Sequence, residues 1–174
     1  MTKILISILF IINTLYAHPH TFIEIYPKIT VKDKIITNIQ FKWQLDEMTS
    51  SMLIMEFDSN ANGKIEAEEN SYAYENYFLV LQDYNYYTDI KINDKVQFFP
   101  KPKNFKATIE NNKICYYFDI DVKYDIHKTI IDFGDTDFFV AMILKKEFIT
   151  VTNAIVKVSD LDNDFYFGYR LELK

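Results

Sequence analysis

Cysteine, glycine and proline are scarce in this chain of 174 residues. The single cysteine, Cys115, excludes an internal disulfide, so the fold must be held by its hydrophobic core or by a bound metal ion. Cys115 lies in the apolar, alternating stretch KICYYFDI and is predicted to be a buried small hydrophobe. Three glycines and four prolines argue against long flexible linkers. The chain therefore predicts a single domain around one core.

Positive charge is also in short supply. The 19 lysines and arginines face 25 aspartates and glutamates, which gives a formal net charge of −6. Such a chain lacks the cations that neutralise phosphates, so we expect no nucleic-acid partner. The acidic balance suits a metal ion or a cation-rich partner instead.

A long hydrophobic run is present only at the start of the chain. Residues 1–17, MTKILISILFIINTLYA, have a basic tip, an apolar middle and a small residue at the end, which predicts a secretory signal peptide. An uncleaved N-terminal anchor is the alternative, although the run is short for a membrane span of about 20 residues. We expect residues 18–174 to form one exported domain, periplasmic or secreted, that does not span the membrane after cleavage.

The rest of the chain predicts an α+β fold that is mostly β. Residues 21–33 and 34–45 read as an opening β-hairpin around an Asp-Lys turn, and several short strands follow residue 84. Two helices interrupt this pattern at 46–57 and 66–83. Asp46 is suited to cap the first helix, whose residues Met48, Met52, Leu53 and Met55 recur at helical spacings. The prediction is a β-sandwich-like domain with a helix–loop–helix insertion at about 46–83.

The segment between the two helices, DSNANGKIEAEE at 58–69, matches the calcium loop of an EF-hand. Such a loop places oxygen ligands at its first, third, fifth, seventh, ninth and twelfth positions and a glycine at its sixth. Here these positions are Asp58, Asn60, Asn62, Lys64 (through its carbonyl), Glu66 and Glu69, with Gly63 at the turn. A calcium site of modest affinity is predicted, because two ligands are neutral amides. The alternative is a polar turn whose side chains only cap helix ends.

Two of the three histidines, His18 and His20, directly follow the predicted cleavage site. After cleavage, the amine and imidazole of His18 and the imidazole of His20 offer three nitrogen donors, which suit Cu, Ni or Zn. Pro19 has no amide proton, so a full amine–amide–amide–imidazole square cannot form. The third donor is then His20 or His127. The alternative is that these histidines bind nothing, since one His-x-His pair is a weak motif.

The chain resembles the domain of unknown function 1007 family. The resemblance rests on AHPHTFIEI, FKWQLDEMTSSML, the loop at 58–69, YNYYTDIKINDK and DFGDTDFFVAM. It implies an exported, periplasmic protein associated with ABC-type or nickel/cobalt-type metal transporters, and no settled activity. The His-Pro-His start falls on His18 and His20, and a second motif falls on Trp43, Asp46 and Glu47. Trp43 is otherwise expected to pack in the core, with Asp46 and Glu47 capping a helix.

Together these features predict a metal-binding accessory or solute-binding component of a transition-metal (nickel, cobalt, zinc or copper) transport system, with a structural calcium site and a membrane transporter as partner. One alternative is a calcium-stabilised exported interaction module without a transition-metal role. Another is an enzyme with copper held by His18 in a histidine brace. We expect no enzymatic activity, because the sequence shows no nucleophile triad, no phosphate-binding glycine loop and no cysteine pair.

Overall fold

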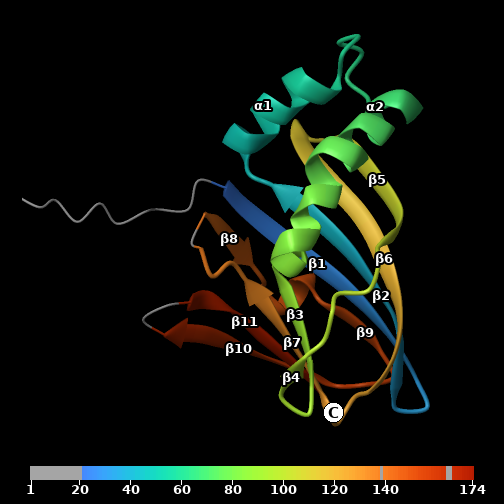
Figure 1. Ribbon diagram of the computed structural model, residues 1–174, viewed down its shortest axis with the longest axis vertical. Helices are drawn as coiled ribbons and strands as arrows, with labels where there is room; N and C mark the ends of the chain where they lie inside the picture. Colours follow the sequence, from blue (N-terminus) through green and yellow to red (C-terminus); the bar gives the residue numbers. More distant parts are fainter. Residues whose placement is uncertain (1–20, 138, 164–165) are drawn as a thin grey trace, which may run out of the picture.

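A computed structural model describes residues 21–137, 139–163 and 166–174 (Figure 1). Strands account for 52% of the structure and helices for 24%, in two sheets, so the predicted mostly β character is confirmed. No helix among these residues is both long and apolar enough to cross a membrane.

The first sheet is built on the predicted hairpin. Its strand order is β5-β6-β2-β1-β8, and a further short strand, β9, also pairs with β1. The hairpin turn uses Asp33 and Lys34, both with positive φ, as a two-residue turn between twisted strands requires. The strands are β1 (Thr21–Lys32), β2 (Ile35–Leu45), β5 (Lys103–Glu110), β6 (Lys113–Asp125), β8 (Val140–Ile143) and β9 (Thr150–Thr152).

The second sheet is antiparallel, with strand order β10-β11-β7-β3-β4. Along two of its central strands, buried apolar residues such as Ile90 and Leu171 alternate with more exposed polar ones, whereas the middle strand also buries Asp132. The strands are β3 (Thr88–Ile92), β4 (Lys95–Val96), β7 (Thr129–Gly134), β10 (Val156–Asn163) and β11 (Tyr166–Leu173). A 3₁₀ turn, Lys146–Phe148, precedes β9.

The predicted helical insertion lies between β2 and β3. Helix α1 (Glu47–Phe57) is followed by a loop and by α2 (Ala67–Ala73), which continues as a π-helical turn at Tyr74–Phe78 and a 3₁₀ segment at Leu79–Tyr87. The two α-helices lie together at the top of Figure 1, with α1 contacting β6 and α2 contacting β5. Their connecting loop is at the far tip of the molecule.

An aromatic cluster forms the part of the core where the helical segment meets the first sheet. The ring of Trp43 lies 5.1 Å from that of Phe118, and Phe78 lies 4.8 Å from Phe118 and 4.9 Å from Tyr86. All four residues are buried, and burial of each such ring contributes about 1.5–3 kcal/mol. Cys115 is buried and free, as the sequence predicts.

Candidate metal centre

The loop at 58–69 is held at both ends by helices whose last and first turns lie close together. The N–H of Asp58 still donates to the carbonyl of Ile54, so the loop leaves α1 directly from its last turn. The preceding residue, Phe57, is buried and fixes that turn against Tyr77, with ring centroids 4.9 Å apart. The rigid ends limit how far the loop's side chains move relative to one another.

Asp58 organises the first half of the loop. Its Oδ1 accepts a hydrogen bond from the N–H of Asn62 (2.9 Å), and its Oδ2 accepts one from the N–H of Gly63 (2.8 Å). Gly63 has φ +77°, a conformation that glycine adopts without strain. No atom lies within 4 Å of where a Cβ would stand, so the dihedral angle and not crowding calls for glycine.

The two amides continue this pattern. Oδ1 of Asn60 accepts from the N–H of Asn62 (3.0 Å), and Oδ1 of Asn62 accepts from the N–H of Lys64 (2.9 Å). Each side chain bonds the backbone two residues on, the local turn that Asn and Asp favour. These oxygens therefore follow one another around a single tight turn, each keeping a second lone pair for another partner.

Glu69 ties the end of the loop back to its beginning. Its Oε1 accepts from the N–H (2.9 Å) and hydroxyl (2.8 Å) of Ser59, and its Oε2 accepts from the N–H of Glu66 (2.9 Å). The N–H of Glu66, together with these bonds from Ser59, holds the pKa of Glu69 below its usual value. Across the loop, the amide of Asn60 donates to Oε2 of Glu66 at 3.2 Å.

The loop borders an open hollow that is strongly acidic. Four carboxylate side chains line it, from Glu56 at the end of α1 and from Glu66, Glu68 and Glu69 at the start of α2. Like charges at this density favour a bound cation, and all the side-chain donors in the loop are oxygens, which suit a hard ion such as calcium. In the described part of the chain, no group of three or more His, Cys, Asp or Glu side chains is arranged to hold a metal ion. The predicted ligand set contains three carboxylates, from Asp58, Glu66 and Glu69, beside two amides and a carbonyl, and these three carboxylates do not form such a group.

The histidines of the second predicted site, His18 and His20, lie outside the described residues. The strand that follows them is anchored by Asp46. The carboxylate of Asp46 accepts from the N–H of Phe22 in β1 (2.9 Å) and from the N–H groups of Met48 (2.9 Å) and Thr49 (3.0 Å) in α1. Asp46 thus caps α1, as predicted, and also joins the helix to the start of β1.

The same bonds set the charge state of Asp46. Burial acts to raise the pKa of Asp46, but the N–H of Phe22 and the donors of Thr49 and Met48 outweigh it and lower the pKa. Its carboxylate is therefore ionised at neutral pH.

Asp135 has a comparable role on the other side of the β1 start. This buried carboxylate accepts from the N–H groups of Asp137 (3.0 Å), Phe139 (3.1 Å) and Val140 (2.9 Å). These bonds order the turn that brings β8 alongside β1, where Thr21 donates to the carbonyl of Phe139 at 3.3 Å.

Comparison with known proteins assigns the chain to a family. Residues 3–159 match the family described as "protein of unknown function (DUF1007)". The chain belongs to this family. An "uncharacterized protein" of Haemophilus influenzae is 29% identical over 144 residues, covering 77% of this chain and 66% of that protein. An "uncharacterized 15.5 kDa protein in trpE 3'region" of Spirochaeta aurantia is 28% identical over 97 residues, covering 54% of this chain and 69% of that protein. The chain thus spans just under two thirds of the Haemophilus relative.

Two further residues of the DUF1007 motifs, Trp43 and Glu47, lie within the described part of the chain, as does His127, which belongs to no family motif. Trp43 is fully buried in the aromatic core, as expected for packing, although its Nε1 has no hydrogen-bond partner among the described residues. Glu47 is exposed in the first turn of α1. His127 lies in an exposed turn, where its N–H donates to Oδ1 of Asp125 at 2.8 Å.

Sequence reasoning missed the role of Asp135 in this DUF1007 chain. The only signal was the run Gly134–Asp137, GDTD, which predicts a turn. Asp135 is buried and bonded to three N–H groups because β8 pairs with β1. The local sequence pattern does not reveal that pairing.

Proposed function

We propose that this protein is an exported metal-binding component of a transition-metal transport system, with calcium as a structural part of its fold. It acts in the periplasm or as a secreted protein, by binding and not by catalysis, with its two sheets forming a β-sandwich scaffold. The loop at 58–69 binds calcium in the manner of an EF-hand. His18 and His20 bind a transition metal (nickel, cobalt, zinc or copper) that passes to or from a membrane transporter.

The observation that carries the calcium site is the arrangement of oxygens around one turn. Asp58, Asn60 and Asn62 are held by successive N–H donors, and Glu69 is bonded back to Ser59 beside them. Calcium needs six to eight oxygens in a flexible cage, and this sequence supplies them at the EF-hand spacing with its glycine in the required conformation. The hydrogen bonds that already hold these side chains support the proposal, because they reduce the conformational freedom that the loop would lose on binding an ion.

Thermal unfolding tests the calcium site. Single extracellular calcium modules bind with a Kd of about 10⁻⁴–10⁻³ M, so about 10 mM calcium stabilises the native state by roughly 1.4–2.7 kcal/mol. We expect the Tm to rise by roughly 3–10 °C. Glu69→Gln should remove most of this calcium-dependent gain, because one ligand oxygen becomes an amide nitrogen.

The matched control is Glu68→Gln, which removes the same charge from an exposed neighbour that is not a predicted ligand. Its calcium-dependent gain should remain close to that of the native chain. An unchanged Tm in calcium, or equal responses from the two variants, contradicts the site. The loop is then a capped polar turn.

The transition-metal site is supported by the His-Pro-His start and by its place before β1. His20 immediately precedes a strand whose first residues are hydrogen-bonded to Asp46 in the helix cap and to the β8 segment. Asp46, whose carboxylate is bonded at the start of β1, is also suited to orient an imidazole ligand.

Metal titration of the exported protein tests this second site. We expect one Cu(II), Ni(II) or Zn(II) per chain, bound more weakly below about pH 6.5, because imidazole must lose its proton to bind. Insertion of a single Gly before His18 keeps both imidazoles but moves the free amine away, so it should weaken binding. His18→Ala and His20→Ala should each weaken it too.

The outcomes separate the two parts of the proposal. If the Gly insertion binds as tightly as the native chain, or if the first residue of the exported protein is not His18, the amine is not a ligand. If the double-alanine variant binds the metal unchanged while calcium still raises the Tm, the protein is a calcium-stabilised interaction module without a transition-metal role.

A further inference from the structure

Helix α1 exposes its methionines. Met48, Met52 and Met55 have 61%, 59% and 85% of their surface accessible to solvent. The chain has five methionines. Of the other two, Met142 is buried in the core and Met1 lies outside the described residues. Sulfur is therefore concentrated on the outer side of one helix.

The three methionines share one face of that helix. With about 100° of rotation per residue, Met52 and Met55 lie about 40° to one side and 20° to the other side of Met48. The three Cα atoms span about 10 Å along the axis. Each methionine side chain is unbranched and rotates about three bonds, so neighbouring sulfur atoms can turn toward a shared ion.

The inward face of α1 makes this exposure unusual. Its buried positions include the polar residues Thr49 and Ser50, both hydrogen-bonded: Thr49 donates to Asp46 at 2.8 Å, and Ser50 donates to Leu45 at 3.2 Å. Burial of a methionine side chain stabilises a fold by about 1.5–3 kcal/mol. Helix α1 loses much of this stabilisation at each of its three exposed methionines. Phe57 is buried and Leu53 and Ile54 are half-buried against the core, so α1 packs through these residues and leaves its methionine face exposed.

We propose that Met48, Met52 and Met55 form a binding site for a soft monovalent cation, Cu(I). Thioether sulfur is a soft ligand that selects Cu(I) over the hard ions bound by oxygen. The exposed Glu47 and Glu56 on the same helix, in a chain of net charge −6, attract a cation to this face. The site goes beyond the proposed function, since it shares no ligand with the loop at 58–69 or with His18 and His20.

Competition with the Cu(I) chelator bicinchoninate, under anaerobic conditions and with the full exported chain, tests the site. We expect one Cu(I) per chain at this face. Changing all three methionines to leucine, Met48→Leu, Met52→Leu and Met55→Leu, should weaken Cu(I) binding more than about tenfold, because even supporting groups around a metal contribute 10–100-fold. Leucine keeps the apolar volume and favours the helix. Circular dichroism checks that the triple-leucine variant is folded.

Two controls distinguish the methionine site from another thioether and from imidazole sites. Met142→Leu removes a buried thioether elsewhere and should leave Cu(I) affinity unchanged. Affinity should also be similar at about pH 7.5 and about pH 5.5, because a thioether carries no proton to displace, whereas imidazole sites weaken over this range.

Three results overturn the proposal. The first is a triple-leucine variant that binds Cu(I) as tightly as the native chain, which would leave the face as an apolar contact surface that leucine serves equally well. The second is equal weakening by Met142→Leu. The third is a loss of Cu(I) binding in His18→Ala/His20→Ala while the triple-leucine variant still binds Cu(I) normally. That result would assign the ion to the histidines.

Discussion

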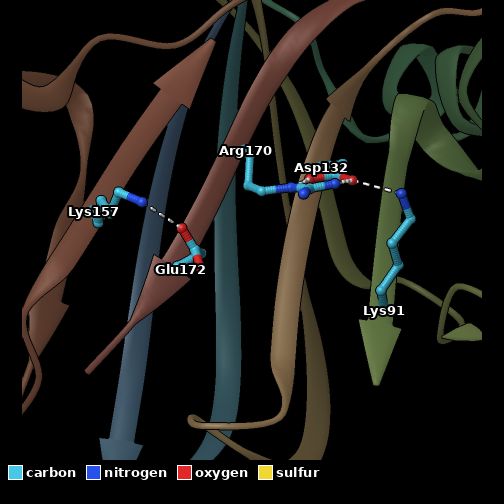
Figure 2. Close-up of polar contacts among 5 residues, drawn as sticks. All are labelled: Lys91, Asp132, Lys157, Arg170 and Glu172. Atoms are coloured by element: carbon cyan, nitrogen blue, oxygen red, sulfur yellow. Dashed lines mark hydrogen bonds and ion pairs between the residues drawn. The ribbon is translucent and has the colours of Figure 1, made fainter. Parts of the chain in front are cut away.

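Asp132 lies in the middle strand of the second sheet, with 1% of its surface exposed, and is bonded to two cations (Figure 2). Nε and Nη2 of Arg170 donate to its two carboxylate oxygens at 2.8 Å each, and Nζ of Lys91 donates to Oδ2 at 2.6 Å. The three residues come from β7, β11 and β3, so one carboxylate links three adjacent strands. Burial acts to raise the pKa of Asp132, but the bonds from Arg170 and Lys91 outweigh it and lower the pKa.

Removing this charge should destabilise the protein. In Asp132→Asn the two cations lose their shared carboxylate. We expect the free energy of unfolding to fall by about 1–3 kcal/mol. This is less than the loss of a fully buried pair costs, because both cations are partly solvated. Urea unfolding at neutral pH measures it. Glu172→Gln, which breaks the exposed pair with Lys157 in the same sheet (3.1 Å), is the control and should change stability by less than about 1 kcal/mol. Equal effects of the two variants contradict this account.

Individual residues differ in how well the sequence predicts them. Asp46 as a helix cap, Cys115 as a buried hydrophobe and Trp43 as a core residue are confirmed, because the start of a helix and the apolar positions of a strand are marked by the surrounding sequence even where the packing partners are not. The ion pair of Asp132 with Arg170 was not predicted, since the partners are 38 residues apart and meet only through the register of β7 with β11.

At the scale of elements, a buried hydroxyl is one of the links between helix α1 and the first sheet. Ser50 Oγ accepts from the N–H of Ile114 in β6 at 3.0 Å and donates to the carbonyl of Leu45 at the end of β2 at 3.2 Å. The hydroxyl supplies a partner to a buried N–H where the two strands diverge, which explains a polar residue with no exposed surface.

Ser50→Ala removes only one oxygen atom, but it should clearly lower the stability of the fold. The N–H of Ile114 loses this partner, and we expect the free energy of unfolding to fall by about 1–3 kcal/mol, measured by urea unfolding. The control is Ser51→Ala at the next position, where the exposed hydroxyl only bonds back to the carbonyl of Glu47 at 2.7 Å. That change should stay within about 0.5 kcal/mol. A Ser50→Ala variant as stable as the control would show that water or a shift of α1 replaces the bond.

The helical insertion shows what periodicity does and does not reveal. Spacing at 46–57 and 66–83 predicts two helices, and both segments are helical. The spacing does not show that the second changes from α to π to 3₁₀ pitch and then kinks at Tyr84–Tyr86, nor that Phe78 and Tyr86 are buried in the aromatic core. Nor does it show that the methionines of α1 face outward, because Ser50 on the inward side bonds to Ile114, which lies 64 residues away in the sequence.

At the scale of the whole molecule, the strand content and the place of the insertion were predictable, while the arrangement of strands was not. Aromatic and β-branched runs bounded by turns mark most strands, and the opening hairpin follows from its two-residue turn. The parallel pairing of β1 with β8 and β9 joins segments more than 100 residues apart, so no local pattern specifies it. The calcium loop was expected from spacing alone, and it stays a prediction until an ion is titrated.

Stability of the whole molecule should depend on pH at the acid end. Asp46 and Asp132 have lowered pKa values, and at Glu110 burial acts to raise the pKa, but hydrogen bonds from Lys42 and Tyr117 outweigh it and lower the pKa to about 2. Carboxyls in an unfolded chain titrate near pH 4, so these groups stabilise the fold fully above about pH 5 and lose that contribution as pH falls through 4 toward 2. Urea midpoints measured from about pH 6 to about pH 2.5 should fall steadily over this range. The same series on Asp132→Asn should show a shallower decline, because one titrating group is gone. A native midpoint that stays constant down to about pH 2.5, or a variant as steep as the native chain, contradicts this assignment of acid sensitivity to the bonded carboxylates.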